Sequence, residues 1–98
     1  MSAVTVRAQL AAPPRAQPVL TDAARASMQL QLRVPGQRDI LRATVHYTGL
    51  GAHGFALRDA KRMLPGDTVT VHCAGLDVDA AGLPRLWGVD CVTHEVRA

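Results

Sequence analysis

Aromatic residues are scarce in this sequence, since Tyr47, Phe55 and Trp87 are the only three among 98 residues. A core built on stacked aromatic rings is therefore excluded, and aliphatic residues must supply most of the 48% hydrophobic share. A chain of this length is expected to form one small domain, residues 1–98, which buries a limited part of its surface. We therefore expect self-association, as a homodimer or homotetramer.

Cysteine is also rare, with only Cys73 and Cys91 in the chain. Small secreted domains that are stabilised by disulfides usually carry more cysteines than this. The four histidines lack the paired spacing of a zinc site, so we expect no metal. Both cysteines are expected to be small, buried hydrophobic residues.

Long apolar segments are missing from the sequence. No run approaches the roughly 18 apolar residues that a membrane-spanning helix needs. The start, MSAVTVRAQL, has no apolar region of the kind found in signal peptides. We therefore expect a cytoplasmic protein with reduced thiols and no membrane partner.

No catalytic motif surrounds the serine, histidine or acidic residues, so we expect a protein that is not an enzyme and needs no cofactor. Residues 49–54, GLGAHG, do match the G-x-G-x-x-G fingerprint of dinucleotide-binding loops. That fold requires parallel strands and two βαβαβ halves, which this chain is too short to hold. We interpret these glycines as a turn between a strand and a helix.

Regular alternation of apolar and polar residues predicts five strands. They span residues 3–10, 26–34, 40–47, 68–73 and 85–96. A Pro-Gly turn joins the second and third strands, which predicts an antiparallel hairpin. The three prolines between the first two strands are expected to break regular structure over residues 11–18.

One helix is predicted over residues 52–64, where apolar residues recur at helical spacing. Its predicted core-facing residues are Phe55, Ala56, Ala60, Met63 and Leu64. The resulting order, β-β-β-α-β-β, is that of a five-stranded Greek-key barrel, the OB-fold. The fold class that we expect is therefore all-β with one helix, as a five-stranded OB-fold barrel.

The chain resembles the bacterial single-stranded DNA-binding protein family, including its primosomal replication protein N relatives, over about residues 4–96. In QLAAPPRAQPVLTDAARAS, Pro13 or Pro14 and Arg15 occupy the proline and basic positions of the family's passage G-x-x-x-x-x-P-x-x-R. RMLPGDTVTV is similar to its passage L-x-K-G-D followed by a strand. The resemblance implies a non-enzymatic protein that binds single-stranded DNA in replication, recombination or a mobile element.

Single-strand binding requires a basic groove for phosphates and flat side chains for bases. Residues 1–64 carry a net charge of +6 and residues 65–98 a net charge of −3, so the basic side chains are concentrated before the fourth strand. We expect the outward residues of the first three strands to form one polar face, with Tyr47 and Trp87 as stacking residues. The candidate nucleic-acid-binding residues are Arg7, Gln29, Gln31, Arg33, Arg42, Thr44, His46, Tyr47 and Trp87.

These residues also have a simpler structural interpretation. Trp87 and Tyr47 can pack in the core or in an interface, and we expect Phe55 to pack in the core. The outward polar residues of the first three strands can form an ordinary solvated face. Gln29 and Gln31 can line a subunit contact. The expected partner is single-stranded DNA, with RNA as a variant, and the alternative function is an OB-fold protein–protein interaction module with little or no nucleic-acid binding.

Overall fold

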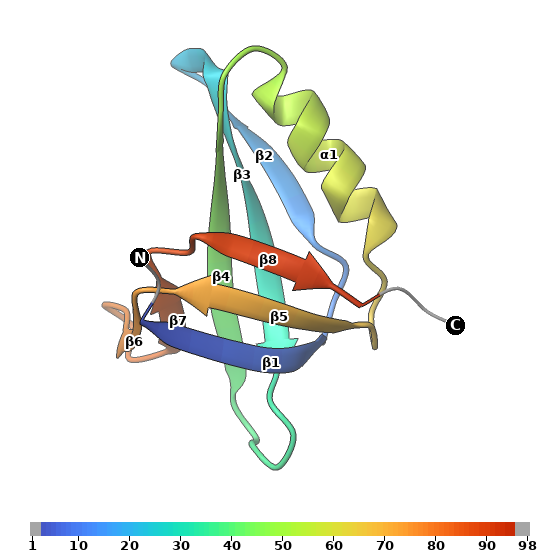
Figure 1. Cartoon of the computed structure of the whole chain (residues 1–98). Coiled ribbons are helices and arrows are strands. Elements are labelled where there is room, and N and C mark those ends of the chain that lie inside the picture. The colour runs from blue at the N-terminus through green and yellow to red at the C-terminus, as the bar shows by residue number, and fades with distance from the viewer. Residues whose placement is uncertain (1–2, 96–98) are drawn as a thin grey trace.

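The computed structural model describes residues 3–95, which form eight strands and one helix (Figure 1). The fold is therefore mostly β with a single helix, as predicted. The elements are β1 (Val4–Leu10), β2 (Arg15–Val19), β3 (Asp22–Arg33), β4 (Ile40–Thr48), α1 (Ala52–Arg62), β5 (Thr68–Cys73), β6 (Gly75–Val78), β7 (Pro84–Trp87) and β8 (Cys91–His94).

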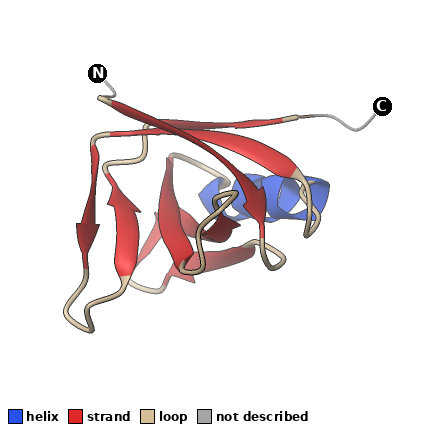
Figure 2. Ribbon diagram, turned by 90° about the horizontal axis from the view of Figure 1, so that it is seen from below, coloured by secondary structure: helices blue, strands red, loops and turns tan. Residues whose placement is uncertain are grey.

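The strands belong to one mixed sheet in the order β6-β7-β4-β3-β1-β5-β8, and β2 pairs with β3. Neighbouring strands are antiparallel except β4 and β7, which are parallel. The sheet bends so strongly that β1, β5 and β8 cross in front of β3 and β4 (Figure 1). In Figure 2, seen from below, α1 lies at a height between these two layers of strands. A single sheet thus supplies both layers around the core.

The predicted hairpin of residues 26–34 and 40–47 is confirmed as β3 and β4. Its inward-facing residues pair across the two strands, with Leu30 opposite Ala43 and Leu32 opposite Leu41. Gly36 takes a φ of 84° in the connecting turn, a conformation that glycine adopts at little cost. Apolar alternation on both strands therefore sets the register, because a one-residue shift would expose the core face.

The core is aliphatic, as the scarcity of aromatic residues requires. The inward parity of the predicted strands leads to residues that are buried or, for Val4, Val6, Val34, Val45 and Tyr47, partly buried against the core. The buried core cluster consists of Ala8, Leu10, Met28, Leu30, Leu32, Leu41, Ala43, Met63, Val69, Val71, Cys73 and Leu86. These residues come from β1, β3, β4, β5, β7 and the end of α1, so burial of their side chains joins both layers of the sheet.

The proline-containing stretch was predicted to be irregular, and this is wrong for its second half. Residues 15–19 form β2, which pairs with β3 from Arg15 opposite Gln29 to Pro18 opposite Ala26. Proline is tolerated there because β2 is an edge strand, where a missing N–H leaves no partner unsatisfied. The register shifts between Pro18 and Val19, which ends the regular pairing.

The helix is confirmed over Ala52–Arg62, but the predicted packing of Phe55 and Leu64 is wrong. Phe55 is 48% exposed, and the Arg58 guanidinium lies 4.9 Å from its ring centroid. Ala56 and Met63 are buried, as predicted. Ala52, which was not predicted to face the core, is also buried and forms a small cluster with Ala56 and Ala26 of β3. Small residues allow the helix to lie close to the strands, which leaves the bulkier Phe55 at the margin of the contact.

The predicted last strand, residues 85–96, is divided within the described part of the chain. β7 ends at Trp87, β8 begins at Cys91, and Gly88 between them has a φ of 62°. A Cβ on Gly88 would lie 2.7 Å from the Ala74 Cβ, so glycine permits the bend. The expected burial of Cys91 is wrong, since its side chain is exposed on β8, and residue 96 lies outside the described residues.

The glycines of residues 49–54 serve the turn into α1. Gly49 and Gly51 have φ values of 103° and 76°, and Gly51 precedes the first residue of the helix. Both conformations are disfavoured for residues with a Cβ.

Within residues 3–95, no helix combines the length and hydropathy that spanning a bilayer would take.

Candidate nucleic-acid interface

A polar groove of about 390 Å³ lies where β3, β4 and β7 meet. The first two strands contribute polar side chains that are paired in register, with Gln29 opposite Thr44 and Gln31 opposite Arg42. Because alternate residues of a strand point to one face, these side chains lie together on the side of the sheet away from the core. Six of the nine candidate residues line the groove: Gln29, Gln31, Arg42, Thr44, His46 and Trp87.

Trp87 reaches the groove through long-range pairing. β7 pairs in parallel with β4, with Arg42 opposite Arg85 and Ala43 opposite Leu86. Leu86 points into the core, so its neighbours Arg85 and Trp87 point outward beside Arg42. The parallel pair therefore brings the only tryptophan of the chain to the basic residues of β4.

The indole of Trp87 is 49% exposed and lies opposite Gly75 in the β6–β7 hairpin. A Cβ on Gly75 would come within 2.8 Å of the indole Nε1. Glycine at this position therefore leaves room for the ring to lie against the neighbouring strand. One face of a half-exposed indole in this position is available for stacking on a planar ligand.

Arg7 was predicted to share this polar face, but the structure places it elsewhere. Its Nε donates to Oε1 of Glu95 at 2.9 Å, and its Nη2 donates to Oε2 at 3.1 Å. The contact lowers the pKa of Glu95, first through the hydrogen bond from Arg7. β1 pairs with β3 through Gln9 and Leu10, whereas Arg7 lies opposite Thr70 of β5, so Arg7 is away from the polar face of β3 and β4.

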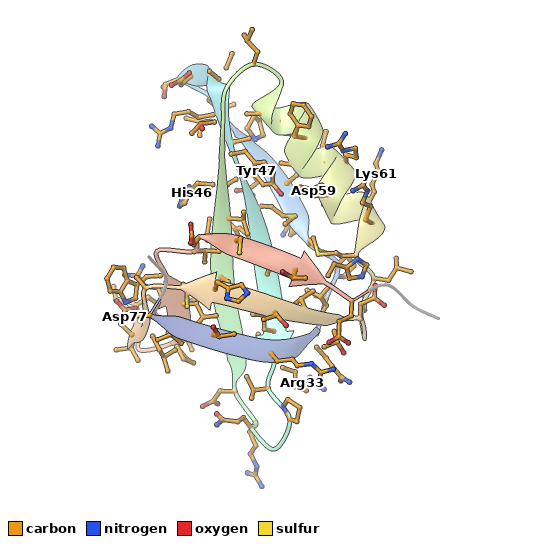
Figure 3. All side chains as sticks on the ribbon, viewed as in Figure 1. Arg33, His46, Tyr47, Asp59, Lys61 and Asp77 are labelled. Carbon is orange, nitrogen blue, oxygen red and sulfur yellow. The ribbon has the colours of Figure 1, made fainter. Side chains whose placement is uncertain are left out.

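Arg33 and Tyr47 also lie outside the groove. Arg33 ends β3 opposite Ile40, and Figure 3 shows it well below His46 along the strands. Tyr47 points toward α1, and its hydroxyl donates a 2.7 Å hydrogen bond to Oδ2 of Asp59. Burial, reinforced by that bond and by the charge of Asp59, holds the pKa of Tyr47 well above 10.0.

Three charged residues of the groove were absent from the predicted set: Arg15, Asp79 and Arg85. Arg15 begins β2, whose pairing with β3 places it opposite Gln29. It is also the residue in the basic position of the family resemblance. Arg85 could have been found from its spacing to Trp87, because residues two apart on a strand share a face.

Two of the groove's three arginines are paired with aspartates of the β6–β7 hairpin. Arg42 forms an ion pair with Oδ2 of Asp79, and the Arg85 Nε lies 2.8 Å from Oδ1 of Asp77. The hydrogen bond to Asp77, with its charge, raises the pKa of Arg85. Among residues 3–95, Arg15 has no side-chain ion pair, so it is the arginine of the groove that is open to an external anion.

A second, more apolar cavity of about 700 Å³ lies on the other side of β4, between α1 and β8. Met28, Val45, Met63 and Val92 supply its apolar lining, and Tyr47 lies at the helix side of it. Near this cavity the His94 Nε2 lies 2.8 Å from Oδ2 of buried Asp67. This cavity is separate from the basic groove, which lies outside the core.

The part of the chain that the structure describes contains no group of three or more His, Cys, Asp or Glu side chains suited to a metal ion. Cys73 and Cys91 are both free thiols, and burial raises the pKa of the Cys73 thiol.

Comparison of the chain with protein families, curated proteins and solved structures finds no match.

Proposed function

We propose that the sheet is an OB-fold barrel in which β7 and β8 act as two halves of one last strand. β7 pairs in parallel with β4, β8 pairs antiparallel with β5, and only Gly88, Val89 and Asp90 separate them. Counted this way, β1, β3, β4, β5 and the combined β7–β8 give the five strands of that barrel. β2 and β6 are then additions at its edges.

The residues of the groove support a non-enzymatic function, the binding of single-stranded DNA. The observation that carries this proposal is the placement of half-exposed Trp87 beside Arg15, Arg42 and Arg85 in one groove. Single-strand binding combines cationic side chains, which hold the phosphates, with aromatic faces, on which bases stack. The groove has both, and it lies at the surface where a flexible strand can enter.

Each group has a distinct role in the proposed mechanism. Arg15 binds a backbone phosphate, and Trp87 stacks on one base. Gln29, Gln31 and Thr44 offer neutral donors and acceptors along the floor of the groove. With a single aromatic platform, binding depends strongly on phosphate contacts and therefore weakens as the salt concentration rises.

Trp87 provides a direct test, because it is the only tryptophan in the chain. Titration with oligothymidylate of about 15 nucleotides, a length in the range that one or two OB-fold sites cover, should quench its fluorescence at low salt. Added salt should reverse the quenching. A folded sample whose fluorescence and oligonucleotide anisotropy stay unchanged at high micromolar protein would sink the proposal. Oligouridylate in the same assay compares RNA with DNA.

A second candidate function is a protein-interaction module, and exposed apolar residues of the β6–β7 hairpin favour it. Leu76 is 60% exposed and Val78 is 64% exposed on β6, whose outer edge is unpaired in the described sheet. Unpaired apolar edge strands are sites of strand addition between chains. On this hypothesis the same edge also supports self-association into a homodimer or homotetramer.

Sedimentation of the wild type and of Leu76→Ser tests this second candidate. A mass above that of one chain, which falls in the variant, would support the β6 edge as a contact. A single-chain mass for the wild type at high concentration would rule out self-association. Oligonucleotide binding by that monomer would favour the nucleic-acid proposal.

A further inference from the structure

The β6–β7 hairpin places two carboxylates against the arginines of the groove. Asp77 faces Arg85 directly across the two hairpin strands. Asp79, in the hairpin turn, reaches Arg42 of β4. Arg15, Arg42, Arg85 and Asp79 line the groove, and with Asp77, which pairs with Arg85 from beside it, these five side chains carry a net charge of +1.

Asp79 is held in place before any ligand arrives. Its Oδ1 accepts hydrogen bonds from the backbone N–H groups of Ala81 at 2.9 Å and Leu83 at 3.0 Å. Its Oδ2 is thereby left to face Arg42. Because the turn itself fixes the carboxylate, Arg42 is paired by the architecture of the hairpin and not by a chance surface contact.

A nucleic-acid phosphate must compete with these carboxylates for Arg42 and Arg85. Duplex DNA offers a high density of phosphates, but its bases are stacked on one another and cannot lie on Trp87. A single strand offers fewer charges and free base faces. Weakening the phosphate contacts therefore reduces the affinity for duplex more than the affinity for a single strand.

We propose that Asp77 and Asp79 are specificity-determining residues, which restrict the groove to single strands by occupying two of its three arginines. This inference rests on the proposed single-strand binding. Discrimination of this kind uses an unfavourable element against the wrong partner as well as contacts with the right one. Arg15, whose guanidinium is not part of the hairpin ion pairs, then makes the principal phosphate contact. Trp87 stacks on a free base, a contact that duplex DNA cannot make.

Asparagine variants test the proposal without removing the turn. Asp79→Asn keeps a side-chain oxygen that can accept from Ala81 and Leu83, and Asp77→Asn keeps the size of the side chain. The matched control is Asp22→Asn, which makes the same charge change. Asp22 also caps a turn, accepting from the Ala24 N–H at 3.0 Å, and it lies outside the groove.

Anisotropy titrations compare labelled oligothymidylate with a labelled duplex of the same length. For duplex we expect affinity to rise by about threefold to fivefold for each aspartate replaced, as exposed ion pairs are released. The rise for the single strand should be smaller, so the preference for single strands falls. The salt slope for duplex should steepen by about 0.9 for each arginine that gains a phosphate.

An unchanged preference in the double variant, or the same change in Asp22→Asn, would overturn the role of the hairpin aspartates while leaving single-strand binding intact. Failure of the folded wild type to bind oligothymidylate at low salt would instead overturn the proposed function, and this inference with it. Circular dichroism of each variant shows whether the hairpin change has unfolded the chain.

Discussion

At the scale of single residues, the three aromatic side chains have different surroundings. Trp87 is half-exposed beside arginines, Phe55 is half-exposed on the helix, and Tyr47 is partly buried with its hydroxyl on Asp59. Only Trp87 lines the basic groove. The sequence predicted both Tyr47 and Trp87 as stacking residues and Phe55 as a core residue, so exposure and neighbouring charge are what favour Trp87.

Trp87→Ala should weaken binding of single-stranded DNA by about 5-fold to 150-fold, because one stacked base is worth about 1–3 kcal/mol. Fluorescence anisotropy with a labelled oligonucleotide measures the change. Phe55→Ala is the matched control, since it removes an equally exposed aromatic ring outside the groove. Equal losses in both variants would mean that Trp87 has no special role.

Tyr47→Phe should leave oligonucleotide affinity unchanged and reduce the free energy of unfolding by about 1 kcal/mol, the typical contribution of one hydrogen bond. The folded state holds the pKa of Tyr47 above its ordinary value of 10.0. The stabilisation is therefore complete below about pH 10 and declines as the pH rises beyond the unfolded-state value.

Urea unfolding of the wild type and of Tyr47→Phe between about pH 8 and about pH 11 compares the two proteins across the tyrosine titration range. At the alkaline end, the free energy of unfolding of the wild type should fall toward that of the variant, which has no phenol to ionise at this position. A constant difference between the two proteins across this range would show that Asp59 and burial do not perturb Tyr47.

At the scale of elements, the bend at Gly88 connects a strand that pairs with β4 to a strand that pairs with β5. The sequence predicts one continuous strand over residues 85–96, because apolar residues recur along it on both faces. Tertiary pairing divides that strand. Its two halves have different partners, and the positive φ of Gly88 permits the change of direction.

Gly88→Ala should lower the free energy of unfolding by about 2 to 4 kcal/mol, because it combines an unfavourable φ with a contact at 2.7 Å from the Ala74 Cβ. Gly54→Ala adds the same methyl group to α1, where nothing lies within 4 Å of the added Cβ. That variant should be more stable by about 0.5–1 kcal/mol. Urea unfolding followed by circular dichroism measures both, and equal effects would contradict a special role for the bend.

At the scale of the whole molecule, the Arg7–Glu95 ion pair joins the first strand to the residue that follows β8. The backbone N–H of Glu95 also donates to the Thr68 carbonyl of β5 at 3.0 Å. Both ends of the described chain are thus fixed to the same part of the sheet. Arg7 therefore serves this contact and not the basic groove, which it does not line.

Glu95→Gln should remove a small, acid-sensitive part of the stability. The folded-state pKa of Glu95 is lowered from 4.5, so its stabilisation is present above that pH and is lost as the pH falls through the folded value. The wild type and variant should therefore differ at neutral pH and converge in acid. Thermal unfolding at neutral and at acid pH checks this, and a difference that persists in acid would argue against the ion pair.

The sequence by itself determined the local features of this protein. Apolar alternation predicted which residues of β1, β3, β4 and β5 face the core, and the Pro-Gly turn predicted the β3–β4 hairpin. These features depend on residues that are close in the chain, so periodicity and turn chemistry record them. The helix was predicted for the same reason, and Ala56 of its predicted inner face is buried, whereas Phe55 is half-exposed and Ala52 is buried in addition.

Only the tertiary structure decided which polar residues meet. The pairing of β4 with β7, separated by more than thirty residues, brings Trp87 and Arg85 to Arg42, and the pairing of β1 with β5 removes Arg7. Contacts of this kind depend on how a strongly bent sheet packs around its core, and no local pattern encodes that bend. The pairing of Arg42 and Arg85 with hairpin aspartates was likewise invisible, since strand alternation predicts which way a side chain points and not which charge it meets.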